Sequence, residues 1–254
     1  MHISIDDTLS VFEDLTKNED NYNSIFDNNI LKFLRKLHNK YGAVFSMYCF
    51  YTNGNFDLSE STDKFSNEFN DNSDWLKFGF HTIDGESNYE STSKEKAKTD
   101  YDEIITQLIR ITGSNNCIDT IPRLQNFAGN EESILAMKNS NNGIKGLLSA
   151  DDNRLSYYLD KEDSDYVLTH DKYMDKDNEI EFISTDLRLE NFDNPYKELK
   201  NRLKSKEYNN RMNILEIFTH EVYLNDSNMK KKMIDCCKFA NKYGYVFEYS
   251  MNRN

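Results

Sequence analysis

The sequence predicts an α/β fold in which seven or eight parallel strands close into a (β/α) barrel, and three observations support this. Short β-rich runs alternate with longer segments of helical periodicity along the chain. No proline-rich or glycine-rich linker and no repeat of fixed period divides the sequence. The length of 254 residues suits one such barrel, which typically has about 250 residues. We therefore predict a single domain over residues 1–254.

The first segment carries the residues on which the functional prediction depends. Residues 2–8, HISIDDT, alternate β-branched and polar side chains, as is typical of a strand. Asp6 and Asp7 stand where this strand leaves the sheet, and neighbouring side chains of a strand point to opposite sides. The two carboxylates can therefore take different roles, although Asp-Asp-Thr is also an ordinary strand end or turn cap. The polar residues 9–22 predict a loop across the strand end.

The next elements follow from periodicity. Leucines and isoleucines three and four apart predict a helix over 25–41, and the run AVFSMYCFY predicts a strand over 43–51 that is covered on both faces. Residues 52–74 are rich in Asn, Asp and Ser and predict an excursion with one short helix. The run WLKFGFH then predicts a strand over 75–81, with His81 at its carboxyl end.

The middle of the chain repeats the alternation. Apolar spacing predicts a helix over 93–111, and 117–124 is the next candidate strand, with Arg123 near its end. A short helix is predicted over 130–138 and a strand over 144–148.

The last third completes the pattern. Its elements follow from four features of the sequence. These are an alternating run, a proline suited to a first helical turn, the run NILEIFTHEVY and a final glycine stop. We predict a helix from about Lys161, a strand over 179–187, a helix over 195–206, a strand over 213–223, a helix over 228–243 and a closing strand over 245–250. His220 lies toward the end of the strand over 213–223.

Charge limits the partners of the protein. Lysine and arginine number 31 against 44 aspartates and glutamates, and the resulting charge of −13 is spread along the chain. Nucleic acids and anionic membranes require a basic face, so neither is expected as a partner. No apolar run reaches the roughly eighteen residues of a membrane span.

The cysteines predict a reducing compartment. Cys49, Cys117, Cys236 and Cys237 show no C-x-x-C spacing, and adjacent residues of a helix point about 100° apart, which suits neither a metal pair nor a local disulfide. We expect four reduced apolar side chains. A charged pair also falls where an apolar leader would start, so we expect a cytoplasmic protein.

A barrel would gather polar residues from distant segments, because the carboxyl ends of all its strands share one mouth. A carboxylate and an imidazole are suitable ligands for zinc or another first-row divalent ion. A second carboxylate or imidazole can transfer a proton, and a guanidinium group can hold the base in position. Singly, an aspartate, a histidine or an arginine here can also be structural. The residues expected at this mouth are Asp6, Asp7, His81, Arg123, Asp152 and His220.

Aromatic residues near the predicted strand ends suggest a sugar as the ligand. Trp75 and Tyr223 could stack their rings on the face of a sugar, although most such side chains belong to the core.

Five short motifs together resemble a known family. In order along residues 3–221 they read ISIDD, FGFHTID, IPRLQNF, GLLSADD and LEIFTHE. This order is similar to that of the polysaccharide deacetylases of carbohydrate esterase family four, a superfamily that includes chitooligosaccharide and peptidoglycan deacetylases. The resemblance implies a distorted (β/α) barrel that removes acetyl groups from N-acetylated sugars with a metal-activated water, the metal being zinc, cobalt or another first-row ion.

The resemblance assigns proton-transfer roles position by position. Asp6 matches the catalytic base, and Arg123 matches the arginine that orients it. His220 matches the catalytic histidine, and Asp151 or Asp152, with Asp152 preferred, would steady it.

The metal motif is incomplete. Asp7 and His81 match two ligands, but the second histidine of the family motif falls on Gly85. Asp84 or Glu86 would have to replace it, and a carboxylate is an acceptable ligand. The sequence therefore leaves three hypotheses: a hydrolase whose metal site is completed by Asp84, Glu86 or water, an inactive barrel that binds carbohydrate, and an unrelated use of the barrel mouth.

Overall fold

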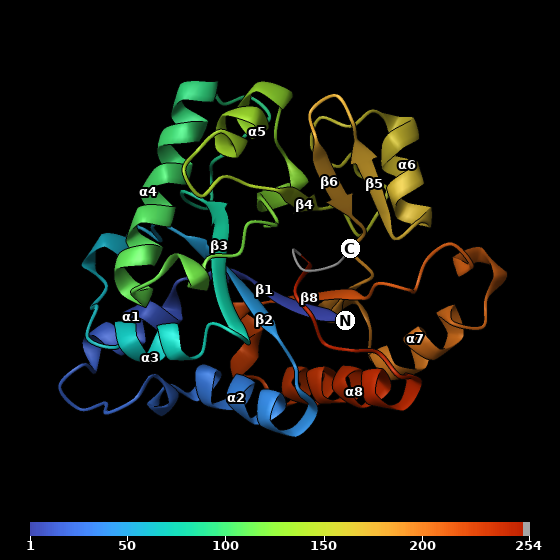
Figure 1. The fold of residues 1–254 in the computed structure, drawn as a ribbon. Helices are drawn as coiled ribbons and strands as arrows, with labels where there is room; N and C mark the ends of the chain where they lie inside the picture. Colours follow the sequence, from blue (N-terminus) through green and yellow to red (C-terminus); the bar gives the residue numbers. More distant parts are fainter. Residues whose placement is uncertain (251–254) are drawn as a thin grey trace.

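A computed structural model describes residues 1–250 and has an α/β architecture with a parallel central sheet (Figure 1). The five strands of this sheet run in the order β3-β2-β1-β8-β7, and every neighbouring pair is parallel. Their bounds are β1 His2–Thr8, β2 Phe45–Phe50, β3 Leu76–Thr82, β7 Leu187–Arg188 and β8 Glu216–His220. The predicted α/β class is therefore confirmed.

A second, three-stranded sheet lies beside the first, in the order β4-β6-β5. The strand β4 pairs with β6 in parallel, whereas β5 pairs with β6 antiparallel. Their bounds are β4 Gly146–Leu148, β5 Lys172–Asp175 and β6 Ile180–Ile183. The strand predicted over 179–187 is thus divided between β6 and β7, which belong to different sheets, and β5 is an element that the sequence analysis did not predict.

The segment 118–122 links the two sheets but is not a strand, which corrects the prediction for 117–124. The amide of Asp119 donates to the carbonyl of Phe78 in β3, over 2.7 Å. On the other side, the amide of Leu148 in β4 donates to the carbonyl of Pro122, over 3.0 Å. Because proline has no N–H group, the ladder cannot be completed at this position.

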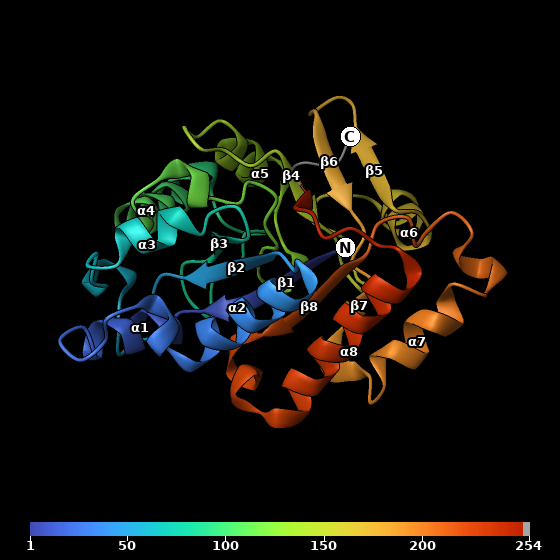
Figure 2. The same cartoon turned by 60° about the horizontal axis from the view of Figure 1, so that its bottom comes forward.

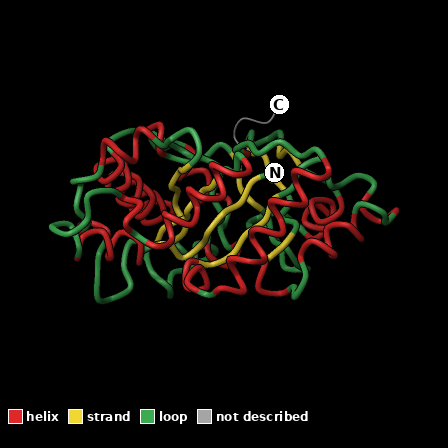
Figure 3. Tube along the Cα trace, turned by 90° about the horizontal axis from the view of Figure 1, so that it is seen from below, coloured by secondary structure: helices red, strands yellow, loops and turns green. Residues whose placement is uncertain are grey.

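The described part of the chain has eight α-helices, and Figure 3 shows helices on the outside of the strands. Helices α2, α8 and α7 lie side by side across one face of the parallel sheet (Figure 2), while α4 and α5 pack together near β3. Their bounds are α1 Ser10–Lys17, α2 Asn29–Tyr41, α3 Ser66–Asp71, α4 Lys94–Thr112, α5 Glu131–Lys138, α6 Lys161–Thr169, α7 Pro195–Arg202 and α8 Ser227–Tyr243. No helix within residues 1–250 is long and apolar enough to cross a membrane.

The strand β1 shows how the sheet separates its two faces. Ile3 and Ile5 are fully buried members of the main apolar core. Side chains alternate along a strand, so the polar residues between them occupy the opposite face. On that face, His2 contacts Glu216 over 2.8 Å and Ser46 over 2.9 Å. The histidine that the sequence left without a role therefore belongs to a fully buried polar network.

Helix α1 occupies residues predicted to be a loop. Its inner side buries Val11, Phe12 and Leu15. Its N-terminus lacks a cap from its own neighbourhood, and instead the carboxylate of Glu221 accepts hydrogen bonds from three successive backbone amides, those of residues 9, 10 and 11, over 3.1, 2.8 and 2.9 Å. A carboxylate at this end also favours the helix dipole. The cap comes from the other end of the chain, so local sequence could not reveal it.

The remaining sequence predictions are largely confirmed. The predicted helices over 25–41, 93–111 and 228–243 form with glycine stops, and all four cysteines are buried and free. The predicted closing strand is an exception, because no strand is assigned to 245–249. This segment instead runs beside Met1, whose amino group donates to Val246 and whose carbonyl accepts from the amide of Glu248.

We expect Glu221→Gln to lower the free energy of unfolding by about 1–2 kcal/mol. The amide removes one of the two accepting oxygens and places an N–H group against backbone donors. Urea unfolding followed by circular dichroism measures the change. The matched control is Glu90→Gln, an exposed position, where no change is expected. Equal stability of the two variants would show that the Glu221 cap does not hold α1.

Candidate functional site

A small cavity of about 130 Å³ lies at the carboxyl ends of β1, β3 and β8. Its lining includes five of the residues that the sequence predicted at the mouth: Asp6, Asp7, His81, Arg123 and His220. The remaining lining residues are Leu124, Gln125, Asn126, Phe127, Arg154, Arg188 and Phe218. The convergence of these distant segments follows from the parallel arrangement of the strands.

A buried ion pair joins Asp6 to Arg123. The Nη1 atom of Arg123 donates to both carboxylate oxygens of Asp6, over 2.9 and 3.2 Å, and to Ser4 Oγ over 2.8 Å. Its Nη2 atom donates to Thr185 Oγ1 over 3.2 Å. The guanidinium also lies 3.9 Å from the centroid of the Phe218 ring. This set of contacts fixes the Asp6 carboxylate at the cavity wall.

Asp7 faces His81 across the cavity because β1 is irregular at this point. The pairing register between β1 and β2 shifts between Ile5 and Thr8, and Asp7 has a φ of 59°, in the left-handed region. Such bulges turn side chains away from simple alternation. Asp6 and Asp7 therefore both line the cavity, where regular alternation would have separated them.

The imidazole of His81 is held in a defined orientation. Its Nδ1 atom donates to the carbonyl of Arg123 over 2.5 Å, and its Nε2 atom lies 3.2 Å from Asp7 Oδ1. Burial alone would raise the pKa of Asp7, but the hydrogen bond from His81 and the charges of His81 and His220 outweigh it and lower that pKa. Asp7 is thus kept as a carboxylate.

Glu190, rather than Asp152, orients His220, which corrects the sequence prediction. The Nδ1 atom of His220 donates to Glu190 Oε1 over 3.1 Å, and the same oxygen accepts from Thr219 Oγ1 over 2.7 Å. Burial acts to lower the pKa of His220, but the hydrogen bond to Glu190 and the nearby carboxylates, Asp6 among them, raise it overall. The histidine is therefore a good proton donor near neutral pH.

Asp151 and Asp152 hold two arginines instead of a histidine. Asp152 accepts a two-pronged set of bonds from Arg154, with 2.8 Å separating Nε from Oδ1 and Nη2 from Oδ2. Asp151 Oδ1 accepts from Nη2 of Arg188 over 2.7 Å. Both arginines line the cavity, whereas neither aspartate does.

The predicted third metal ligand is also corrected. The carboxylate of Asp84 is not part of the cavity lining, because it accepts hydrogen bonds from the amides of Glu86 and Ser87 and closes its own turn. At Gly85, an added Cβ would meet no atom within 4 Å, and the Gly85 carbonyl accepts from the lining residue Gln125. The position of the missing histidine is therefore open and adjacent to the cavity.

The two predicted sugar-stacking residues differ in position. Trp75 is buried at the amino end of β3, where it stacks on His38 at a centroid distance of 4.7 Å, so it is a core residue and not a ligand contact. Tyr223 is 45% exposed, and its ring lies edge-on to the imidazole of His220 at 6.3 Å. Tyr223 stays a candidate for substrate contact beside the cavity.

Three functional candidates escaped the sequence analysis, namely Glu190, Arg154 and Arg188. Glu190 lies two residues beyond the short strand β7, and a single strand was predicted over 179–187, so its place near a strand end was not evident from the sequence.

The donor set at Asp7 and His81 fits a divalent ion. An imidazole that donates from Nδ1 to a carbonyl presents Nε2 as a ligand. The separation of 3.2 Å between Asp7 Oδ1 and His81 Nε2 is close to the roughly 3.3 Å between two ligands of a tetrahedral ion. No group of three or more His, Cys, Asp or Glu side chains suited to a metal was found within residues 1–250. Water or substrate would have to complete the coordination.

Comparison with known proteins adds no family assignment. No protein-family model matches the chain, and no curated protein matches it significantly. The function is therefore inferred from the geometry of the cavity.

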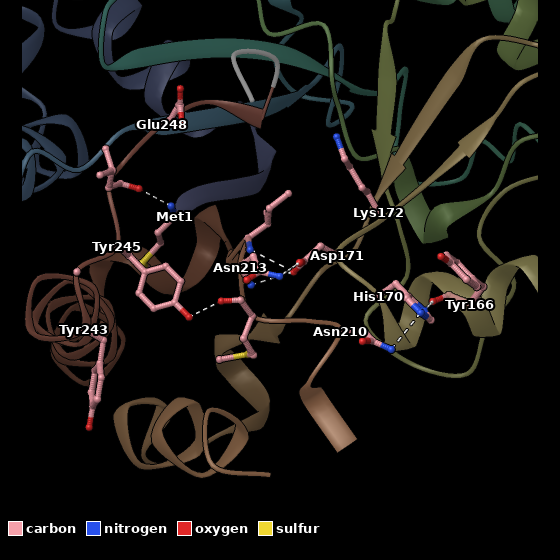
Figure 4. Close-up of a pocket in the computed structure, with 14 residues that line it drawn as sticks. Met1, Tyr166, His170, Asp171, Lys172, Asn210, Asn213, Tyr243, Tyr245 and Glu248 are labelled. Carbon is pink, nitrogen blue, oxygen red and sulfur yellow. Dashed lines mark hydrogen bonds between the residues drawn. The ribbon is translucent and has the colours of Figure 1, made fainter. Parts of the chain in front are cut away.

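A larger cavity, of about 850 Å³, lies at the opposite end of the parallel strands (Figure 4). Its polar groups already serve as local bonding partners: Asp171 accepts from the amide and side chain of Asn213, and the Tyr245 hydroxyl donates to the carbonyl of Met212. His170 and Asp171 both line it, but His170 is bonded to the Tyr166 carbonyl and to Asn210, and Asp171 is bonded to Asn213. The small cavity is therefore the better candidate for chemistry.

We expect Glu190→Gln to lower the pKa of His220, because the variant loses the charged acceptor of its Nδ1 proton. A pH titration of the imidazole resonances by NMR measures this. A raised pKa in the folded state adds stability below the unfolded value and loses it as the pH rises through the folded value. Glu190→Gln should therefore cost more stability at pH 5 than at pH 9.

The matched control is Glu198→Gln, which removes a carboxylate paired with Arg202 on α7, outside the cavity. It should leave the titration of His220 unchanged. An unaltered His220 titration in Glu190→Gln would contradict the assigned pairing.

Proposed function

We propose that the protein is a metal-dependent hydrolase, similar to the polysaccharide deacetylases, that removes an acetyl group from an N-acetylated sugar. The observation that carries the proposal is one cavity lined by the pair Asp7 and His81, by Asp6 fixed on Arg123, and by His220. Together these supply a cation site, a held base and a proton donor, the groups that hydrolysis of an amide requires. The proposal includes a cytoplasmic location.

A distorted barrel is part of the same proposal. The segment 118–122 hydrogen-bonds to β3 on one side and to β4 on the other. The extended run 180–188 pairs through β6 with β4 and through β7 with β8. These contacts support a closed wall in which the two sheets are parts of one ring.

The chain's own residues would divide the chemistry as follows. A divalent ion held by Asp7 and His81 would polarise the amide carbonyl and lower the pKa of a water. Asp6 takes the proton of the attacking water, and Arg123 keeps its carboxylate in place. His220, as an imidazolium whose Nδ1–H is bonded to Glu190, donates its Nε2 proton to the departing amine.

The size of the cavity suits the acyl end of such a substrate. About 130 Å³ corresponds to roughly four water molecules at about 30 Å³ each. An acetamido group and a water fit this space, and the sugar ring would remain at the opening. The partly exposed ring of Tyr223 beside His220 is placed to contact it.

A second function is a carbohydrate-binding protein without turnover. Only two side chains of the expected metal motif converge in the cavity, and Gly85 stands where a third would be. Without a bound ion, the cavity could still hold an acetamido group.

Zinc or cobalt binding and acetate release test the proposal together. We expect the protein loaded with zinc or cobalt to release acetate from N-acetylated chitooligosaccharides. His220→Ala should lower the rate by about 10²–10⁴-fold, since it removes the general acid. Asp7→Asn should abolish metal uptake measured by calorimetry. Asp84→Asn is the matched control and should keep both metal uptake and activity.

Metal uptake without acetate release, or release that His220→Ala does not reduce, would contradict the hydrolase proposal. Saturable binding of the oligosaccharide without metal uptake would instead support the binding protein.

A further inference from the structure

Two arginines line the cavity without a role in the proposed reaction. Arg154 and Arg188 come from different segments and contribute to the same wall as Asp6 and Asp7. Their side chains are 40% and 24% exposed, so both are accessible to a ligand.

Both guanidinium groups are held in place by ion pairs and by aromatic rings. Asp151 and Asp152 form ion pairs with them, and Asp151 Oδ1 contacts both, over 2.7 Å to Arg188 and 3.5 Å to Arg154. Aromatic rings add to this fixation. The guanidinium carbon of Arg154 lies 4.7 Å from the centroid of Phe127, and that of Arg188 lies 5.1 Å from the centroid of Phe218. A ligand would therefore find them already oriented.

The arginines retain unused donors. A guanidinium has five N–H groups, and the contacts of Arg188 with other side chains use its Nη2 atom. Arg154 directs Nε and Nη2 to Asp152, which leaves Nη1 without a hydrogen-bond partner in that ion pair. Donors remain available for an incoming group.

The donors of these two arginines indicate which kind of ligand the cavity binds. The protein carries a net charge of −13, and Asp6 and Asp7 line the cavity itself. Asp151 and Asp152 already balance the charges of the two arginines, so what the arginines offer a ligand is a set of oriented N–H donors, which a neutral sugar needs less than an anion does. Arginine forks also match the geometry of carboxylate and phosphate groups.

We propose that Arg188 and Arg154 bind an anionic group, a carboxylate or a phosphate, that the substrate carries near its acetamido group. This inference rests on the proposed function, because it names the class of N-acetylated sugar that the same cavity accepts. The sugar would place its acetamido group between Asp7 and His220 and its anion against the two arginines.

Calorimetric titration of the zinc-loaded protein with matched sugars tests the inference. The probes are N-acetylglucosamine, its 1-phosphate, its 6-phosphate and the corresponding sugar with a 6-carboxylate. We expect at least one anionic probe to bind about tenfold or more tightly than the neutral sugar, as hydrogen bonds to charged groups imply. Comparison of the phosphates with the carboxylate identifies the preferred anion.

Variants separate a ligand site from a structural ion pair. Arg188→Gln combined with Arg154→Gln should remove the preference for the anionic probe and leave the affinity for the neutral sugar unchanged. The matched control is Arg202→Gln, which removes an arginine that is also paired with a carboxylate and stacked on aromatic rings, but outside the cavity. It should keep the preference.

Equal affinity for all probes, no binding of any probe, or a preference that survives in the double variant would each overturn the inference. Acetate release from the neutral oligosaccharide is measured in parallel. Release without an anion preference overturns only the anion site, whereas loss of both metal uptake and release overturns the proposed function.

Discussion

The candidate site depends on one buried cation, the guanidinium of Arg123. It is 1% exposed, donates to Asp6 and Ser4 of β1 and to Thr185 beyond β6, and stacks on Phe218 of β8. The carbonyl of the same residue fixes the imidazole of His81 in β3. A charge removed from water must be paired closely, and loss of one partner of such a pair typically costs about 3–5 kcal/mol. Arg123 therefore joins Asp6, the proposed base, and His81, a proposed ligand of the cation, to one fixed point.

Two further structural features position Asp7 and His220 at the cavity. The bulge in β1, with Asp7 at a φ of 59°, turns a second carboxylate into the cavity that regular alternation would have turned away. At the end of β8, Glu221 caps α1, the helix that directly follows β1. The ends of β1 and β8 are thereby held together, with Asp6 and His220 in register.

The sequence predicted what depends on local signals and on the rule for parallel strands. Helix α2 carries its own cap at Asn28 and its own stop at Gly42, and Asp6 and His220 meet because they end neighbouring strands. It failed where the deciding partner lies far along the chain. Helix α1 is capped from residue 221, and Glu190 was hidden at the end of the two-residue strand β7. Trp75 begins the strand predicted to end at His81, so it lies at the end away from the cavity and belongs to the core.

The central claim is that Asp7 and His81 together form a cation site beside a base held by Arg123. Anomalous scattering from a crystal soaked in zinc tests it most directly. We expect a zinc peak within bonding distance of Asp7 Oδ1 and His81 Nε2, roughly 2.0–2.2 Å from each. The carboxylate of Asp6 should still be paired with Arg123. A cavity without a peak at saturating zinc, or a peak bound only to other residues, would contradict it.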